Sequence, residues 1–256
     1  MKEILSTKNT MIKELKKLHK KKHREDNQEY MIEGFHLIEE AVKANAQIKW
    51  ILFNQRGESE WSAWLNNQSQ EQLIRVSDEV LESISELPTP QGMIAIIMMP
   101  TEEDIQLEGG WLLLDNVQDP GNVGTMIRTA DAAGLSGVIL GEGSSDIYNT
   151  KVLRAMQGSN YHLPVIRKPL VEMINKFKAA KIPVYGTELN PEAIAYQKLT
   201  GLDQYALIMG NEGQGVSSEI LELTDETIYI PIRGAAESLN VAIAAGILMY
   251  HLELNK

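Results

Sequence analysis

Polar side chains suited to binding a phosphate or orienting a hydroxyl gather in three glycine- and asparagine-rich segments of the C-terminal half. The segments span residues 116–130 (NVQDPGNVGTMIRTA), 209–215 (MGNEGQG) and 230–241 (IPIRGAAESLNV). Each follows a short apolar run typical of a buried strand and precedes a helical pattern. Parallel α/β sheets bind ligands beyond the carboxyl ends of their strands, so we expect one site built from three loops.

Four side chains in these segments are the strongest candidates for a direct role in binding or catalysis. The guanidinium of Arg128 suits a phosphate or a hydroxyl, although an arginine on a surface helix is the alternative. The amides of Asn122 and Asn240 both donate and accept, so each can orient a hydroxyl or fix a loop, and Ser238 or Asn240 also fits a helix N-cap. The carboxylate of Glu212 either orients Arg128 or caps the next helix.

The three segments resemble, in residue type and order, the signature motifs of the SpoU, or TrmH-like, RNA 2′-O-ribose methyltransferases of the SPOUT superfamily. The matching residues are Asn116, Asp119, Pro120, Asn122, Gly124 and Arg128 in the first motif, Gly210, Glu212 and Gly215 in the second, and Pro231, Ser238, Leu239 and Asn240 in the third. Residues 30–34 (YMIEG) and 89–92 (TPQG) look like that family's substrate-binding domain. Three ordered motifs are far more specific than one glycine-rich loop.

The resemblance implies transfer of a methyl group from S-adenosylmethionine to a ribose 2′-hydroxyl of RNA, with ribosomal RNA as the first substrate class. It makes Arg128 the central catalytic residue, with Asn122, Glu212 and Asn240 beside it. We favour a positioning and electrostatic role for Arg128, because a guanidinium stays protonated in proteins. Alignment of the two reactants is the main task, and no metal is needed. The implied cofactor contacts are Thr187, Met209, Gly210, Asn211, Gly213, Ile230, Ile232 and Leu239.

Three other functions are compatible with parts of the pattern. Transfer RNA is the other substrate class for the same reaction. A non-catalytic, ribosome-associated RNA-binding protein on the same scaffold is disfavoured because Arg128, Asn122 and Asn240 are all present. A nucleotide-binding dehydrogenase ranks last, because no G-x-G-x-x-G follows its first expected strand.

Composition restricts the class of protein further. The 256 residues are 43% hydrophobic, enough for one large or two modest cored domains. The absence of cysteine excludes disulfides and thiolate metal sites, and the five histidines lack metal-ligand spacing. The N-terminal residues lack the apolar core of a signal peptide, and no apolar run reaches the length of a membrane span. We therefore predict a cytoplasmic protein with no membrane or metal partner.

Positive charge is concentrated at one end of this acidic chain. Residues 1–24 carry nine Lys/Arg and two Glu, a net charge of +7, which leaves −18 for the remainder of a chain whose total is −11. A basic segment on an acidic body is what a phosphate-contacting arm would look like. The alternative is an ordinary solvated surface helix.

Alternation of apolar runs and helical patterns predicts an α/β fold in two domains. The acidic stretch 100–110 (PTEEDIQLEGG) reads as a linker, so we expect a substrate-binding domain over residues 1–104 and a catalytic domain over residues 105–256. The second domain should hold a largely parallel sheet. The family resemblance adds a trefoil knot and a homodimer. Expected helices span residues 34–43, 61–66, 79–85, 124–133, 150–156, 170–180 and 240–254, with short helices near residues 11–18 and after 217; expected strands span 48–53, 72–76, 92–98, 112–114, 137–140, 162–165, 182–185, 206–209 and 227–230.

Overall fold

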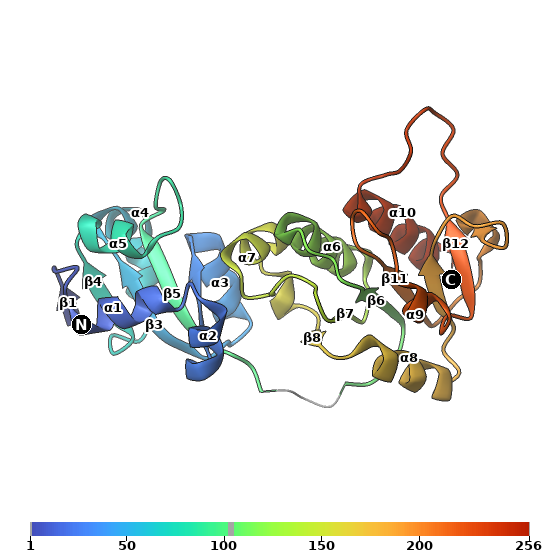
Figure 1. Ribbon diagram of the computed structural model, residues 1–256. Helices are drawn as coiled ribbons and strands as arrows, with labels where there is room; N and C mark the ends of the chain where they lie inside the picture. The colour runs from blue at the N-terminus through green and yellow to red at the C-terminus, as the bar shows by residue number, and fades with distance from the viewer. Residues whose placement is uncertain (1, 102–104, 256) are drawn as a thin grey trace. The chain divides into compact units, whose positions relative to one another are not determined.

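The computed structural model describes residues 2–101 and 105–255, and its chain divides into two compact units (Figure 1). Unit 1 takes the chain up to Thr101 together with Tyr148–Tyr161, and unit 2 takes the rest, up to Ile147 and from His162 onward. Within the described residues, no helix is both long and apolar enough to cross a bilayer.

Unit 1 is built on a mixed sheet of five strands in the order β1-β4-β3-β5-β2. Strand β5 runs antiparallel to both β2 and β3, whereas β1, β4 and β3 are parallel. The strands are β1 (Lys2–Ile4), β2 (Glu29–Glu33), β3 (Ile48–Phe53), β4 (Leu73–Val76) and β5 (Met93–Met98).

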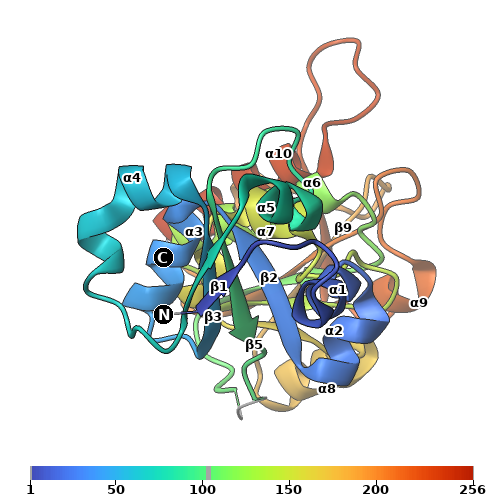
Figure 2. The same ribbon diagram turned by 90° about the vertical axis from the view of Figure 1, so that its left-hand side faces the viewer.

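Helices cover both faces of this sheet, as Figure 2 shows, with α1 and α5 on one side and α3 and α4 on the other. Successive side chains of a strand point to opposite faces of the sheet, which explains the two helical layers. Leu52 and Ile94 join the core with α1 and α5, while their strand neighbours point to the other face. The helices are α1 (Thr10–Lys17), α2 (Lys21–Asn27), α3 (Phe35–Lys43), α4 (Gln55–Leu65), α5 (Asp78–Ile84), and α7 (Thr150–Met156), which is followed by the short η1 (Ser159–Tyr161).

Unit 2 contains a seven-stranded sheet in which every neighbouring pair is parallel, in the order β10-β12-β9-β11-β6-β7-β8. The chain enters in the interior of the sheet at β6, proceeds outward to β7 and β8, and then crosses to the other half. The strands are β6 (Gly110–Leu114), β7 (Gly137–Leu140), β8 (Val165–Arg167), β9 (Val184–Thr187), β10 (Ile194–Ala195), β11 (Tyr205–Met209) and β12 (Glu226–Tyr229).

Helices sandwich the sheet of unit 2. On one face α8 (Leu170–Ala179) and α9 (Ser218–Leu221) contribute to a core with Trp111, Leu113 and Ile208. On the other face α6 (Pro120–Ala133) and α10 (Val241–Leu254) pack against each other. The short η2 (Tyr196–Lys198) follows β10. These layers confirm the α/β prediction with a parallel sheet.

Several local expectations were wrong. Strand β8 lies three residues later than the predicted 162–165, and α4 begins at Gln55 with a break at Trp61 instead of beginning near residue 61. For the N-terminal helix we expected Ser6 or Thr7 as the N-cap, but the side chain that caps α1 belongs to Asn9. Strands β1, β2 and β10 and helix α2 were not predicted, because the strands are short or paired at sheet edges and α2 has almost no apolar face.

Candidate active site

The three motif loops emerge from one edge of the unit 2 sheet. The first loop follows β6, the second follows β11, and the third follows β12. Strands β6 and β11 are direct neighbours, and only β9 stands between β11 and β12. All of these strands are parallel, so their carboxyl ends lie at the same edge of the sheet. The loops lie where the strand order switches direction, because the chain runs from β6 outward to β7 and β8 and later returns to place β11 on the other side of β6. The expected convergence of the loops is found.

A chain of side-chain hydrogen bonds joins the three loops. Asn240 donates Nδ2 to Oδ1 of Asn122 at 3.0 Å, and Asn122 donates Nδ2 to Oε1 of Glu212 at 3.1 Å. Asn240 also caps α10, because its Oδ1 accepts from the backbone of Ala242 at 2.9 Å. An amide both donates and accepts, so Asn122 is the one member of this chain that holds the other two.

Glu212 anchors the second loop to the start of α6. Its carboxylate accepts the backbone N–H groups of Asp119 at 2.9 Å and Gln118 at 3.2 Å, in addition to the Asn122 amide. Neither of the two roles that the sequence suggested for Glu212 is found. It bonds no guanidinium among the described residues, and the helix it serves is α6, 90 residues earlier, not the helix that follows it.

The pKa of Glu212 lies below its usual value. Partial burial, the largest single influence, raises it, but hydrogen bonds from Asn122, from the backbone of Asp119 and from other backbone N–H groups together outweigh burial. A lowered pKa means that the carboxylate stabilises the fold above the unfolded pKa and loses this contribution only as the pH falls through the lowered value. The anchor is therefore ionised throughout the neutral range.

Asn211 ties the second loop to the first by a separate route. Its Nδ2 donates to the backbone oxygen of Asn116 at 2.9 Å, and its Oδ1 accepts from the backbone of Gly213 at 3.0 Å. Asn116 adopts a left-handed backbone with φ of 54°, a conformation that asparagine tolerates better than most residues. Asn211 was predicted as a cofactor contact, and here its side chain organises the loop.

Sequence reasoning missed Asp115, which supports the same pair of loops. Its Oδ2 accepts the backbone N–H of Ser217 at 2.7 Å, and its own N–H donates to Met209 at 2.8 Å. The available signal was an acidic residue immediately after a fully apolar strand, in a position where a short side chain can satisfy loop amides.

Arg128 lies in the third turn of α6 with its side chain exposed. It forms no hydrogen bond or ion pair with any described residue. Gly124, four residues earlier in the same helix, is buried. The guanidinium is therefore free of any role in holding the fold and remains available to a ligand.

The predicted cofactor contacts lie around the same edge. Thr187 ends β9 and donates its hydroxyl to the backbone oxygen of Ile208 at 2.9 Å, and Met209 ends β11 and is buried. Ile230 is half-buried, whereas Ile232 and Leu239 are exposed in the third loop.

Gly210 has no room for a side chain. A Cβ atom there would stand 2.1 Å from the backbone of Gly215 and Val216. The second loop folds back tightly on itself, closed by paired backbone bonds between Asn211 and Gly215 at 2.9 Å. Glycine is therefore required by close backbone approach.

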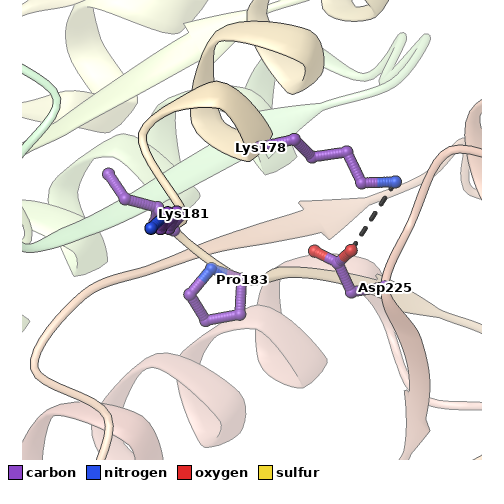
Figure 3. Close-up of a pocket in the computed structure, with 5 residues that line it drawn as sticks. Lys178, Lys181, Pro183 and Asp225 are labelled. Atoms are coloured by element: carbon purple, nitrogen blue, oxygen red, sulfur yellow. Dashed lines mark ion pairs between the residues drawn. The ribbon is translucent and has the colours of Figure 1, made fainter.

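A separate hollow lies at the opposite, amino edge of this sheet (Figure 3). Lys178 forms an ion pair with Asp225 at 3.6 Å and donates to the backbone oxygen of Leu223 at 2.7 Å. Asp225 also accepts from the backbone of Val184 at 2.8 Å. Lys178 joins α8 to the segment before β12, and Asp225 joins that segment to β9, so we assign the hollow a structural role.

One group of possible metal ligands occurs in the described part of unit 1. His36, Glu39 and Glu40 lie on adjacent turns of α3 with ligand atoms within 4.8 Å of one another. Both glutamates bind Lys43, at 3.1 and 3.0 Å. The ammonium of Lys43 already binds both carboxylates, so we assign no metal to this group.

Comparison with known proteins identifies the motif-bearing part of the chain. Residues 111–250 match the model of the SpoU rRNA Methylase family, and residues 9–95 match that of the MRM3-like substrate binding domain. The chain belongs to the SpoU rRNA methylase family. The matched SpoU region contains every residue of the hydrogen-bonded chain described above.

Similar proteins extend the SpoU match over nearly the whole chain. The chain is 46% identical to the 23S rRNA (guanosine(2553)-2′-O)-methyltransferase RlmP of Bacillus subtilis, over 98% of this chain and 99% of the relative. An AdoMet-bound rRNA methyltransferase from Sinorhizobium meliloti matches with a TM-score of 0.87 and 32% identity, covering 98% of this chain and 96% of the other. The SpoU methyltransferase AviRb from Streptomyces viridochromogenes, in complex with AdoMet, matches with a TM-score of 0.87 and 27% identity, covering 96% and 98%.

Proposed function

We propose that this protein transfers the methyl group of S-adenosylmethionine to a ribose 2′-hydroxyl of 23S ribosomal RNA. The observation that carries the proposal is the hydrogen-bonded chain from Asn240 through Asn122 to Glu212, because it joins all three SpoU motifs into one site. The similarity to RlmP over nearly the full length of both chains favours the guanosine equivalent to the one in that relative's name.

The residues of the site suit the cofactor. The tightly folded backbone around Gly210 and the aliphatic side chains of Ile230 and Leu239 are appropriate for a flat adenine bound by main-chain groups. When bound, S-adenosylmethionine supplies a methyl group on a positively charged sulfur. We assign the remaining contacts to the residues expected from the motifs, namely Thr187, Met209, Asn211, Gly213 and Ile232.

The protein's own residues align the attacking hydroxyl. We assign to Arg128 the binding of the target ribose and its phosphate, which holds the oxygen in line behind the methyl carbon. Asn122 and Asn240 fix the loop geometry, and Glu212 holds the first loop against the second. The bound cofactor would supply the methyl group that the ribose oxygen accepts and would be left as a neutral thioether, and the hydroxyl proton would pass to a phosphate oxygen or water.

Replacing Asn122 by aspartate tests the chain of hydrogen bonds. The Asn122→Asp substitution keeps the shape of the side chain but removes the donor to Glu212 and places two carboxylates side by side. Like charges at this distance repel each other and disturb the site. We expect kcat/KM for RNA methylation to fall by about 100-fold or more. The matched control is Asn175→Asp on the exposed face of α8, and equal activity of the two variants would contradict a role in catalysis.

Helix α10 supports the proposed homodimer. It packs into unit 2 through Ala242, Leu248 and Met249, yet its opposite face is also apolar. A helix that is apolar on all sides is normally buried on all sides. The side chains left exposed include Ile243, Tyr250 and Leu254. Because Asn240 caps this same helix, a second copy on that face would adjoin the active site.

Charged substitutions on α10 should produce monomers. We expect the wild-type protein to have twice its 28.6 kDa chain mass in light scattering, and the Ile243→Asp/Leu254→Asp variant to have the mass of one chain. The control is Val171→Asp/Leu189→Asp, which changes two other exposed apolar residues of unit 2. A dimeric α10 variant, or a monomeric wild type, would refute this interface.

The proposed division of labour follows the two matched regions. We assign RNA binding to residues 1–104 and catalysis to residues 105–256, with the segment 148–161 packed in unit 1 although it belongs to the SpoU match. The proposal includes the family's trefoil knot in the C-terminal region. It also includes a cytoplasmic location.

The decisive experiment measures transfer of labelled methyl groups from S-adenosylmethionine to unmodified total RNA, followed by mapping of 2′-O-methylated riboses. We expect one modified guanosine in 23S ribosomal RNA. Modification of transfer RNA alone would transfer the assignment to that substrate class. RNA and cofactor binding without methylation would support the non-catalytic alternative.

A further inference from the structure

The basic N-terminal segment is a fixed part of unit 1 and not a free arm. Ile12, Leu15 and Leu18 are 0–5% exposed and belong to the core between the sheet and helices α1 and α5. The buried Arg24 donates Nη1 to the backbone oxygens of Leu18 at 2.7 Å and His19 at 2.9 Å, which secures the turn between α1 and α2. The lysines of this segment therefore extend from backbone that is packed into the core of unit 1.

Five of these lysines carry uncompensated charge. Their side chains are exposed or half-exposed, and their ammonium groups form no ion pair or hydrogen bond with any described residue. In contrast, Lys17 binds Glu14 at 2.8 Å and Lys21 lies 3.6 Å from Glu25. We call the uncompensated group the lysine surface, and it consists of Lys8, Lys13, Lys16, Lys20 and Lys22.

Part of this positive charge lies at a helix N-terminus, where it is electrostatically unfavourable. Lys20, Lys21 and Lys22 occupy the beginning of α2, where the partial positive charge of the helix end disfavours cations. The first turn contains no acidic residue, and Lys20 makes no side-chain capping bond. A sequence that keeps unfavourable charge in one place commonly does so for function.

The chemistry of this surface fits a polyanion. Helix α1 directs its apolar side into the core of unit 1, so no apolar face remains to enter a lipid bilayer, as a membrane-binding amphipathic helix requires. The rest of the chain carries a net charge of −18 and repels nucleic acid. A local positive surface on such a body directs a polyanion to one place.

We propose that the lysine surface binds the sugar–phosphate backbone of the substrate RNA. The inference rests on the proposed function and identifies where unit 1 contacts that RNA. Lysine ammonium groups release counterions from phosphates, so the contact contributes affinity without reading sequence. It should therefore determine how tightly RNA is held and leave the methyl-transfer step unchanged.

The test compares two fourfold lysine-to-glutamine variants with equal change in charge. Binding to an unmodified 23S ribosomal RNA transcript is measured at several KCl concentrations, together with KM and kcat for methylation. The test variant is Lys13→Gln, Lys16→Gln, Lys20→Gln and Lys22→Gln. The control variant is Lys43→Gln, Lys176→Gln, Lys181→Gln and Lys198→Gln, all at exposed lysines outside the lysine surface.

We expect the test variant to bind RNA at least about tenfold more weakly at low salt, with the slope of log affinity against log salt reduced by about 3. Its KM for RNA should rise while kcat at saturating RNA remains that of the wild type. Equal slopes and affinities in the two variants would overturn the inference. So would unchanged RNA binding combined with loss of binding to phosphatidylglycerol vesicles, which would assign the surface to membranes.

Binding is measured independently of turnover, so the two proposals fail separately. An RNA-binding protein that transfers no methyl group would refute the proposed function, and the salt slopes would still decide the role of the lysine surface. Equal thermal unfolding of both variants and the wild type verifies that charge, and not folding, has changed.

Discussion

Replacing Arg128 by alanine should reduce methyl transfer by a factor on the order of 10³ while leaving the fold intact. The guanidinium is exposed and has no partner among the described residues, so its removal breaks no bond that stabilises the native state. The loss should appear in kcat under saturating RNA and S-adenosylmethionine. Thermal unfolding should be nearly unchanged, as is usual for exposed side chains without such contacts.

The Arg128→Lys variant separates charge from geometry. Lysine keeps the positive charge but lacks the planar fork that binds a phosphate through two parallel hydrogen bonds. We expect it to recover only a small part of the activity. The control is Arg75→Ala, which removes a half-exposed arginine of β4 in unit 1 that pairs with Glu3 and Glu58. If Arg128→Ala methylated RNA at the rate of this control, the guanidinium would be an ordinary surface group.

Substituting Gly210 should have the largest effect on cofactor binding. A methyl group in Gly210→Ala would lie 2.1 Å from backbone atoms of Gly215 and Val216, so one of the two chain segments must move. Forcing extra volume into such a site costs about 1–3 kcal/mol. We expect a lower melting temperature and an affinity for S-adenosylmethionine at least about tenfold weaker, measured by calorimetry.

Gly246→Ala is the matched control for this substitution. The added methyl group meets only the Thr129 side chain, at 3.5 Å, an ordinary contact distance. Alanine is also a better helix former than glycine inside α10, so the melting temperature should remain the same or rise. Cofactor binding by Gly210→Ala equal to that of Gly246→Ala would show that the second loop tolerates displacement and does not shape the cofactor site.

Local patterns were sufficient to predict most elements of unit 2. Strands β6, β7 and β11 are uninterrupted apolar runs. Helix α6 was predicted over 124–133 but begins at Pro120, because Asp119 caps it and proline is favoured in the first turn of a helix. Asn240 likewise acts as the predicted N-cap of α10. Such signals are contained in a few adjacent residues, so no distant part of the chain is needed to interpret them.

Local patterns failed where a neighbour in space determines the structure. Strand β10 has two residues and exists only through pairing with β12, and β1 depends in the same way on β4. The sequence of segment 148–161 predicts a helix. Its packing in unit 1, however, depends on contacts such as that between the hydroxyls of Tyr30 and Tyr161, which are 3.0 Å apart.

The sequence by itself determined the α/β class, the order of the three motifs and the residue types available for chemistry, because strand runs, helix caps and glycine-rich turns are local properties. Only the tertiary structure decided which of those residues meet. Asn122 and Glu212 are 90 residues apart, and Asn122 and Asn240 are 118 apart. Their contact depends on the order of β6, β11 and β12 in the sheet, which periodicity does not encode. For the same reason the sequence suggested either Arg128 or the next helix as the partner of Glu212, whereas the fold presents the amide of Asn122 and leaves Arg128 without a partner among the described residues.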